Sequence, residues 1–326
     1  MFAITTTCRD KPTMTTFRLL PLISALTFAF VAATAASAKD VKDLQIAVIP
    51  KVAVPFFDDC NTGAKNEAEA LGVKYQWVVP QNTQGSTQVR ILEDLIAKKV
   101  DGIAISVNEP KSVEAAIKKA ISNGIKVVTF DSDSPKSGRS MYIGTINTAA
   151  GETMGESMAK AIGGEGEVAV VTGQLGAVNL NERITGIKKA LAKYPKIKLV
   201  ATEGTEDDLA KAVSTTESIF RAHPALKGIF GVSQVGGPAV SKVMATKEFA
   251  AKKETVKVFA FDDLPDTVKG VKEGYIQGIM VQRPVTMGNL AVRHLVDQIT
   301  GKETAPKDVD TGVNVVTSQN LGSYTK

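Results

Sequence analysis

Residues 46–49 read Ile46-Ala47-Val48-Ile49, a short and wholly apolar run that ends at Pro50. A run of this kind, bounded by turn-forming residues, is typical of a strand buried on both faces. Similar runs follow at residues 75–79, 102–105 and 126–130. Segments with helical periodicity lie between them, at residues 61–71, 86–98 and 112–122. This alternation of strand and helix predicts a parallel sheet covered by helices on both sides.

The same pattern starts again in the second half of the chain. Its apolar runs lie at residues 167–171, 198–201, 228–231 and 256–261. Its helical segments lie at residues 181–193, 209–222, 238–247 and 267–273. We therefore predict two doubly wound, Rossmann-like lobes, with residues 277–284 forming a strand that returns between them. Because ligands of such sheets bind at the carboxyl ends of the strands, functional residues are expected in the loops that follow them.

The first 38 residues have the pattern of a secretory signal peptide. Arg18 precedes an apolar run at residues 19–31, and small residues follow, ending in Ala36-Ser37-Ala38. The apolar run is too short to serve as a membrane anchor. We therefore predict export from the cytoplasm with cleavage after Ala38, and Met14 gives a better-proportioned signal than Met1.

The charge balance indicates no polymeric partner. The chain has 39 Lys and Arg against 34 Asp and Glu, a formal net charge of +5. The leader holds more basic than acidic residues, so the mature chain is closer to neutral. It has no basic run of the length found in nucleic-acid arms or polybasic membrane patches. We therefore expect no nucleic-acid partner.

The residues that usually carry catalysis or bind metals are scarce and badly spaced. Cys8 lies in the leader, so Cys60 has no partner for an internal disulfide and is interpreted as a packed helix residue. His223 and His294 lack metal-ligand spacing. The glycine-rich residues 163–166 precede a strand and lack the Lys-Ser/Thr ending of a phosphate loop. We expect no catalytic residue, no metal and no cofactor.

Aromatic and polar residues gather instead at the expected strand exits and near them. The candidates are Phe56, Phe57, Asp131, Arg183, Asp262 and Gln282. A sugar has hydroxyls that donate and accept hydrogen bonds, and it has an apolar C–H face. Carboxylates accept from hydroxyls, Arg donates, Gln does both, and an aromatic ring covers the C–H face. An Asp at a strand exit can also cap the next helix, so it is the joint placement that predicts a polyol site.

The order of these motifs resembles the ribose-binding-like periplasmic binding proteins of ABC sugar importers and their rhamnose- and allose-binding relatives. The similarity extends over the whole mature chain and is carried by Phe56-Phe57, Thr129-Phe130-Asp131, Asn181-Glu182-Arg183, Phe261-Asp262-Asp263 and Val281-Gln282-Arg283-Pro284. It implies the type I periplasmic binding protein fold, with two lobes joined by a three-strand hinge. The N-terminal lobe would comprise residues 39–144 and 283–311, and the C-terminal lobe residues 145–282 and 312–326.

The resemblance also implies roles for individual residues. Phe56 and Phe57 would stack on the sugar, and Asp131 and Asp262 would accept its hydroxyl protons. The remaining ligand-binding residues would be Lys51, Arg183, Ser233 and Gln282. Hinge closure would occur about the chain crossings near Thr145, Gln282 and Thr311.

Three departures from the ribose-binding pattern bear on the identity of the sugar. Val54 stands where an Asn normally donates to the sugar, and Ser132 where ribose binders have Arg. No aromatic residue lies near Glu206-Asp207 to complete a ring sandwich. Each lost contact is worth about 1 kcal/mol or more in a closed site, which argues against ribose itself.

The resemblance implies a monomeric, non-enzymatic periplasmic protein that captures a monosaccharide or related polyol and delivers it to the membrane subunits of an ABC importer. An alternative is a sensor that presents its ligand to a chemoreceptor or sensor kinase. Repressors that share this fold need a helix-turn-helix module ahead of the first lobe, and here a signal peptide occupies that place.

Overall fold

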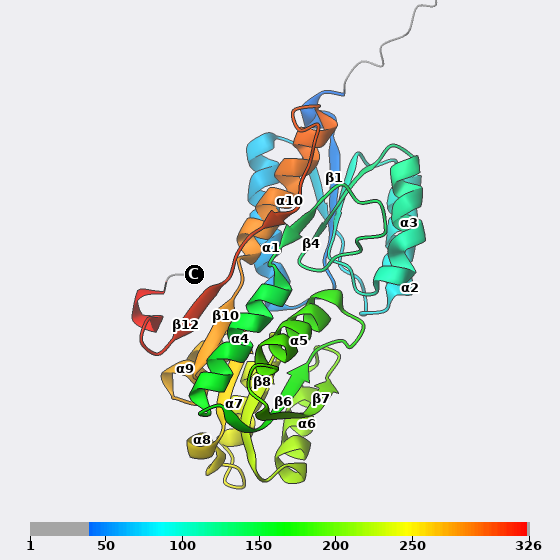
Figure 1. Cartoon of the computed structure of the whole chain (residues 1–326). Helices are drawn as coiled ribbons and strands as arrows, with labels where there is room; N and C mark the ends of the chain where they lie inside the picture. The colour runs from blue at the N-terminus through cyan, green and yellow to red at the C-terminus, as the bar shows by residue number, and fades with distance from the viewer. Residues whose placement is uncertain (1–38, 325–326) are drawn as a thin grey trace, which may run out of the picture. The chain divides into compact units, whose positions relative to one another are not determined.

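The computed structural model describes residues 39–324, and the predicted leader with its cleavage site after Ala38 lies outside them. The described chain forms two six-stranded sheets, each with helices on both faces (Figure 1). This arrangement confirms the predicted α/β class with two parallel-sheet lobes.

The first sheet has the strand order β11-β5-β4-β3-β1-β2, and all of its neighbouring strands are parallel. Its strands are β1 (Gln45–Ile49), β2 (Lys74–Trp77), β3 (Gly102–Ile105), β4 (Lys126–Phe130), β5 (Tyr142–Gly144) and β11 (Val309–Asp310). Its helices are α1 (Pro55–Leu71), α2 (Gly85–Ala97), α3 (Pro110–Ser122) and α10 (Pro284–Ile299). In β1, Ile46 and Val48 pack with α1 and α10, whereas Ala47 and Ile49 pack with α2 and α3. Burial on both faces explains why this run has no polar alternation.

The second sheet has the order β12-β10-β9-β8-β6-β7, with only β12 antiparallel to its neighbour. Its strands are β6 (Glu165–Thr172), β7 (Lys196–Gly204), β8 (Leu226–Gly231), β9 (Lys257–Phe261), β10 (Gly278–Val281) and β12 (Asn314–Thr317). Helices α4 (Asn147–Ala161) and α5 (Val178–Leu191) cover one face. The other face is covered by α6 (Leu209–Ala222), α7 (Gly236–Met244) and α9 (Pro265–Lys272).

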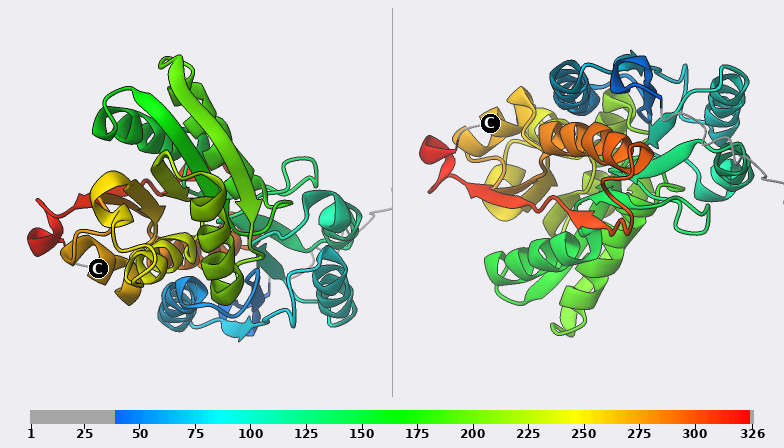
Figure 2. Two further views of the ribbon diagram at one scale, coloured as in Figure 1. Left: turned by 90° about the horizontal axis from the view of Figure 1, so that it is seen from below. Right: turned by 90° about the horizontal axis from the view of Figure 1, so that it is seen from above.

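The chain passes from one sheet to the other three times. It leaves the first sheet after β5, returns after β10 and crosses again between β11 and β12. The last crossing is the red segment that runs from one sheet to the other in Figure 2. Strand β10 pairs with β9 and β12, so the predicted return strand is a member of the second sheet.

Several elements differ from the prediction or were not foreseen. Helix α1 begins at Pro55 rather than at residue 61, so Phe56 and Phe57 lie in its first turn. The helices and strands that the sequence did not reveal are α4, α8 (Lys252–Thr255), α10, β5, β11 and β12. Helix α4 was not predicted because small residues weaken its amphipathic pattern. Gly151 and Gly155 face the neighbouring helix at positions where larger apolar side chains would reveal a helical period.

Each lobe contains a helix pair in close contact through glycine. A Cβ atom on Gly288 of α10 would overlap the carbonyl oxygen of Cys60 in α1. In the second lobe, a Cβ atom on Gly151 of α4 would overlap the carbonyl oxygen of Arg183 in α5. Cys60 is fully buried, as expected for a packed helix residue, and burial raises the pKa of its thiol.

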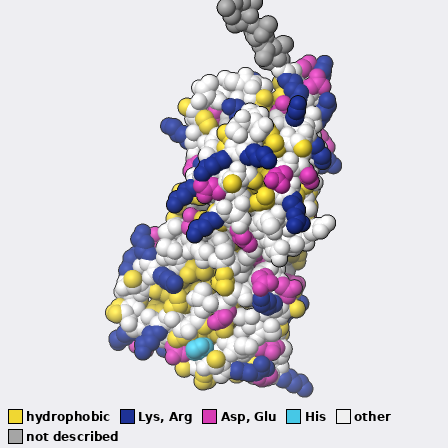
Figure 3. Space-filling view, turned by 90° about the vertical axis from the view of Figure 1, so that its right-hand side faces the viewer, with side chains coloured by type: hydrophobic (Ala, Val, Ile, Leu, Met, Phe, Trp, Pro, Cys, Tyr) yellow, Lys and Arg dark blue, Asp and Glu magenta, His cyan; other side chains and the backbone are white. Residues whose placement is uncertain are grey.

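The surface carries both signs of charge. On the face shown in Figure 3, Lys and Arg alternate with Asp and Glu over both lobes. Within residues 39–324, none of the helices has the length and apolar character needed to cross a bilayer.

Candidate functional site

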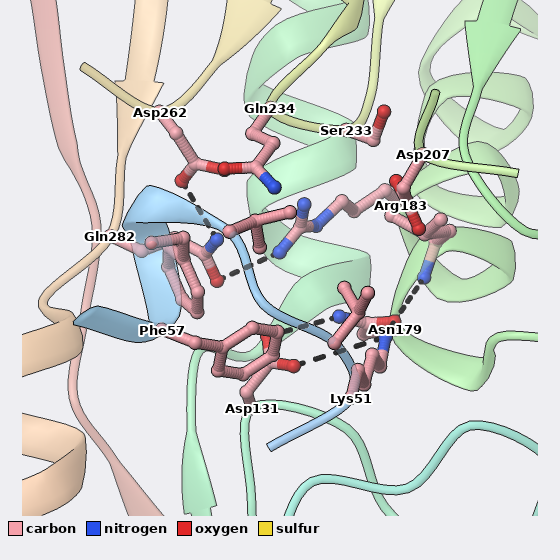
Figure 4. Close-up of a pocket in the computed structure, with 14 residues that line it drawn as sticks. Lys51, Phe57, Asp131, Asn179, Arg183, Asp207, Ser233, Gln234, Asp262 and Gln282 are labelled. Carbon is pink, nitrogen blue, oxygen red and sulfur yellow. Dashed lines mark hydrogen bonds and ion pairs between the residues drawn. The ribbon is translucent and has the colours of Figure 1, made fainter. Parts of the chain in front are cut away.

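A small pocket, partly open to solvent, lies where the carboxyl ends of strands from both sheets meet (Figure 4). All eight predicted ligand-binding residues line it, namely Lys51, Phe56, Phe57, Asp131, Arg183, Ser233, Asp262 and Gln282. Six further residues complete the lining: Val52, Val54, Asn179, Leu180, Asp207 and Gln234. Ser132 is buried next to Asp131 but does not line the pocket.

Two aspartates occupy equivalent places in the two sheets. Asp131 directly follows β4 and Asp262 directly follows β9, and each strand is third from the same edge of its sheet. Both have left-handed backbone conformations, with φ of 57° and 66°. This region is unfavourable for residues other than glycine, and such strain clusters at functional sites. The bend directs both carboxylates into the pocket.

Asp131 belongs to a hydrogen-bond network that joins the two lobes. Ser106 Oγ donates to its Oδ2 at 2.6 Å, and Asn179 Nδ2 donates to its Oδ1 at 3.1 Å. Lys51 Nζ lies 3.8 Å from Asp131 Oδ2 and donates to Asn179 Oδ1 at 2.9 Å. Lys51 and Asp131 follow strands of the first sheet, whereas Asn179 is in α5 of the second lobe. Burial lowers the pKa of Lys51, and the negative charge of Asp131 opposes this shift.

Asp262 belongs to a second network, which stays within the second lobe. Gln282 Nε2 donates to Asp262 Oδ1 at 2.9 Å, and Arg183 Nη2 donates to Gln282 Oε1 at 2.7 Å. Arg183 also donates to Asn147 Oδ1 at 2.9 Å and to the Val232 carbonyl at 2.8 Å. Burial raises the pKa of Asp262 to about 6, although the charge of Arg183 favours the carboxylate.

The guanidinium of Arg183 is held on a rigid support. Its central carbon lies 3.9 Å from the ring centroid of Phe261, a cation–π geometry. Only 2% of the residue is exposed, and burial lowers its pKa. Because three of its five N–H groups have protein acceptors, the others are available to a ligand.

Phe56 and Phe57 form the apolar wall of the pocket. Their rings lie edge to face with centroids 5.2 Å apart, and Phe57 packs in the same way on Phe130 at 6.3 Å. Pro55 starts α1 just before them, which fixes both aromatic residues in the first helical turn. The C–H face of a ligand ring can pack on such an aromatic wall.

Three polar lining residues were not predicted, and each carries a signal that could have revealed it. Asn179 lies four residues before Arg183, so the two share one face of α5. In the Asn181-Glu182-Arg183 motif, by contrast, the Asn181 side chain donates to the Leu175 carbonyl at 2.8 Å. Asp207 and Gln234 follow β7 and β8, where the rule for parallel sheets already places ligand-binding residues.

The chemistry of the pocket suits a neutral molecule with many hydroxyl groups. Carboxylates, amides, an ammonium and a guanidinium surround a small space with one aromatic wall. Within the described part of the chain, His, Cys, Asp and Glu form no cluster of three or more that could hold a metal ion.

Comparisons with known proteins agree with this chemistry. A family model described as a periplasmic binding protein domain matches residues 46–303. A solved solute-binding protein of an ABC transporter from Burkholderia graminis, in complex with D-arabinose, is 73% identical; the match covers 88% of this chain and 100% of that one, with a TM-score of 0.87.

Two more distant relatives extend the comparison. The ribose import binding protein of Salmonella typhimurium is 26% identical over 89% of this chain and 95% of its own length. The solved complex described as XylFII–LytSN contains a chain that is 29% identical, with a TM-score of 0.79 and coverage of 85% of this chain and 98% of that one. The chain therefore belongs to the periplasmic binding protein family.

Proposed function

We propose that this protein is an exported solute-binding protein of an ABC importer, that it captures a monosaccharide in the pocket between its lobes, and that an aldopentose such as D-arabinose is the ligand. The observation that carries the proposal is the pair of strained aspartates, Asp131 and Asp262, which enter one pocket from equivalent strands of the two sheets. The D-arabinose bound by the 73% identical relative supports the pentose.

The contacts available in the pocket match the groups of a sugar. Asp131 and Asp262 would accept hydroxyl protons, and Arg183 and Gln282 would donate from the second lobe. Lys51 and Ser233 would add further polar contacts, while Phe56 and Phe57 would cover a C–H face. Val54 takes part in the lining as an apolar residue, and this favours a sugar other than ribose.

Binding is coupled to rotation of the lobes in this proposal. The N-terminal lobe comprises residues 39–144 and 283–311, the C-terminal lobe comprises residues 145–282 and 312–326, and the crossings near residues 145, 282 and 311 act as the hinge. A ligand that touches both lobes favours the closed state by its differential contacts. Gln174 Nε2 donates to the Thr83 carbonyl at 2.8 Å, a bond that joins a loop of each lobe and opens when they separate.

The same proposal assigns the protein to the periplasm after removal of the leader. It acts there as a monomer that delivers its sugar to the permease subunits, without catalysis of its own. A second candidate function is presentation of the ligand to a sensor protein. The observation that favours it is that one of the similar solved chains comes from a structure described as a complex, XylFII–LytSN.

The test is isothermal titration calorimetry of the mature chain, residues 39–326, with D-arabinose and a panel of pentoses, hexoses and polyols. We expect saturable one-to-one binding of at least one pentose, together with a smaller radius of gyration by X-ray scattering when that sugar is bound. Absence of binding to every sugar and polyol would contradict the proposal. Binding without compaction would contradict hinge closure alone.

A further inference from the structure

A third aspartate in the pocket shares the strained backbone of the other two. Among the described residues, those other than glycine with positive φ are Lys99, Asp131, Glu206, Asp207 and Asp262. Three of these five are the aspartates that line the pocket. Asp207 has φ of 59° and follows β7, a strand at the edge of the second sheet. Strain of this kind persists only where the surrounding structure holds it in place.

The local structure is shaped to accommodate the Asp207 carboxylate. A Cβ atom on Gly173 would overlap Asp207 Oδ1, so the carboxylate lies against backbone that only glycine leaves open. Ser233 and the backbone of Gln174 lie near the Asp207 carboxylate, and both favour its charged form. Burial raises the pKa of Asp207, and the positive charge of Lys51 opposes this shift.

Lys51 and Asp207 attract each other across the pocket without forming a direct ion pair. Lys51 Nζ lies 3.8 Å from Asp131 and donates to Asn179 at 2.9 Å, whereas Asp207 acts on it over a longer distance. An ammonium has three N–H donors, so one remains for a ligand. A hydroxyl group placed between Lys51 and Asp207 could accept from the first and donate to the second.

A buried polar group without a hydrogen-bond partner lies next to Ser233 in the chain and also lines the pocket. Gln234 is only 8% exposed and lines the pocket, yet its buried Oε1 atom has no hydrogen-bond partner in the structure. Leaving such an atom unpaired is costly, and a ligand hydroxyl that donated to it would remove this cost. Figure 4 shows Asp207 and Ser233 on the side of the pocket away from Phe57. The two ring faces of a bound sugar therefore meet different surroundings, one aromatic and one polar.

We infer that Asp207 and Lys51 together determine which pentose the protein prefers, by binding a hydroxyl group that projects from the sugar ring on the side away from Phe57. This inference rests on the proposed function and deepens it. Pentose epimers differ in the direction of single hydroxyl groups. An epimer whose hydroxyl points elsewhere leaves the Asp207 carboxylate and the Lys51 ammonium without their partner.

The size of the expected effect follows from hydrogen bonding to charged groups. Losing one such bond in a closed site costs on the order of 10- to 100-fold in affinity. Asp207→Asn keeps the shape of the side chain but removes its charge, and Lys51→Met removes the donor. Both changes act on the same hydroxyl, so their effects should not add.

The experiment measures the dissociation constants of D-arabinose, D-ribose, D-xylose and D-lyxose by calorimetry. The proteins are the wild type, Asp207→Asn, Lys51→Met, the double variant and the control Glu206→Gln. The control removes one negative charge at Glu206, the residue before Asp207. Glu206 is exposed, has the same left-handed backbone conformation and pairs with Lys211. We expect Asp207→Asn to weaken binding of the preferred pentose at least tenfold and that of the least preferred less than threefold, so that the preference collapses.

The control should keep both affinity and preference, and Lys51→Met should reduce the preference in the same way as Asp207→Asn. A purely structural role would weaken all four sugars by the same factor, and that result would overturn the inference. Unchanged constants in Asp207→Asn would also overturn it while leaving the proposed function intact. If the wild type bound none of the sugars in either experiment, both proposals would fail. Should Asp207→Asn not fold, the preference of Lys51→Met decides the question.

Discussion

The two aspartates that enter the pocket from equivalent strands have different partners. Asp131 of the first lobe accepts from Asn179 of the second lobe and lies 3.8 Å from Lys51. Asp262 accepts from Gln282, the residue that directly follows β10 in its own sheet. The same position in the two sheets thus serves a contact between lobes in one case and a contact within a lobe in the other.

This difference indicates that the two aspartates have different roles in ligand binding. The first-lobe carboxylate takes part of its hydrogen bonding from Asn179 of the second lobe, so in the proposed hinge closure its network would form as the lobes close. The second-lobe carboxylate is already organised by Gln282 and Arg183, and its burial raises its pKa to about 6. Replacing each residue separates the two roles.

The largest effect is expected from Asp131→Ala. It removes acceptors for the ligand and also leaves Lys51 without its ion-pair partner. Two charge-assisted interactions are lost, so pentose affinity should fall about 100-fold or more. Asp262→Ala should weaken binding at least tenfold, with thermal stability nearly unchanged. Calorimetry of both variants measures the difference.

The exposed Asp266→Asn variant, on α9, serves as the control and should bind like the wild type. A smaller loss of pentose affinity in Asp131→Ala than in Asp262→Ala would contradict the roles proposed for the two aspartates. An unchanged affinity in either alanine variant would refute its assigned role as a ligand-binding residue.

The next effect concerns the close helix pairs of the two lobes. Gly288→Ala and Gly151→Ala both place a methyl group on a backbone carbonyl oxygen, and each should lower the free energy of unfolding by about 2 to 3 kcal/mol. Only Gly151→Ala displaces α5, which carries Asn179 and Arg183. Because hydrogen bonds tolerate displacement less well than apolar contacts, this variant should also lose about tenfold in pentose affinity.

Gly288→Ala displaces α1 and its aromatic wall, so its affinity should change less than threefold. Urea unfolding gives the stability and calorimetry the affinity of each variant. The control is Gly322→Ala, because Gly322 has open space around it and an ordinary φ, and this variant should match the wild type. Gly301 is less suitable because its φ is positive. Equal losses of affinity in both helix-pair variants would show that the two lobes respond alike.

The smallest effect is the pH dependence contributed by Asp262. Its pKa is about 6 in the folded protein and 3.8 in its ordinary state, so the folded protein binds more protons between these values. The free energy of unfolding contributed by this group therefore falls as pH rises from about 4 to about 6, by on the order of 2 kcal/mol. Urea unfolding of the ligand-free protein at several pH values measures the decline.

Asp262→Asn cannot ionise and should lack this decline, so its stability relative to the wild type should increase from pH 4 to pH 7. The comparison between the two proteins cancels the contributions of other titrating groups. A parallel pH dependence in both proteins would show that burial does not raise the pKa of Asp262.

The fold was predictable where short apolar runs are continuous and bounded by turn-forming residues, because this combination is typical of strands buried on both faces. The runs at 46–49 and 126–130 correspond to β1 and β4. Short edge strands such as β11, which has two residues, carry too few residues for a pattern. Helix α4 was missed because close helix packing requires glycine where an amphipathic helix would have larger apolar residues.

The candidate site was predictable in part for a related reason. Aspartates after β4 and β9 stand out because their chemistry is unusual at the end of an apolar strand. Asn179 and Gln234 do not stand out, because polar amides are common in loops and in first helical turns. Only the position of the helix or strand in the folded protein brings these side chains to the pocket.

The sequence by itself determined the alternation of buried strands and helices, the two halves and the residue types at the strand exits, because periodicity and apolar content are local properties. Tertiary structure decided which exits meet in one pocket, that Asn179 joins Lys51 to Asp131, and that Asp207 lies against Gly173 facing Lys51. The hydrogen bond between Lys51 and Asn179, for example, joins residues 128 positions apart. No local pattern encodes such distances, because they depend on how the two sheets are packed and connected.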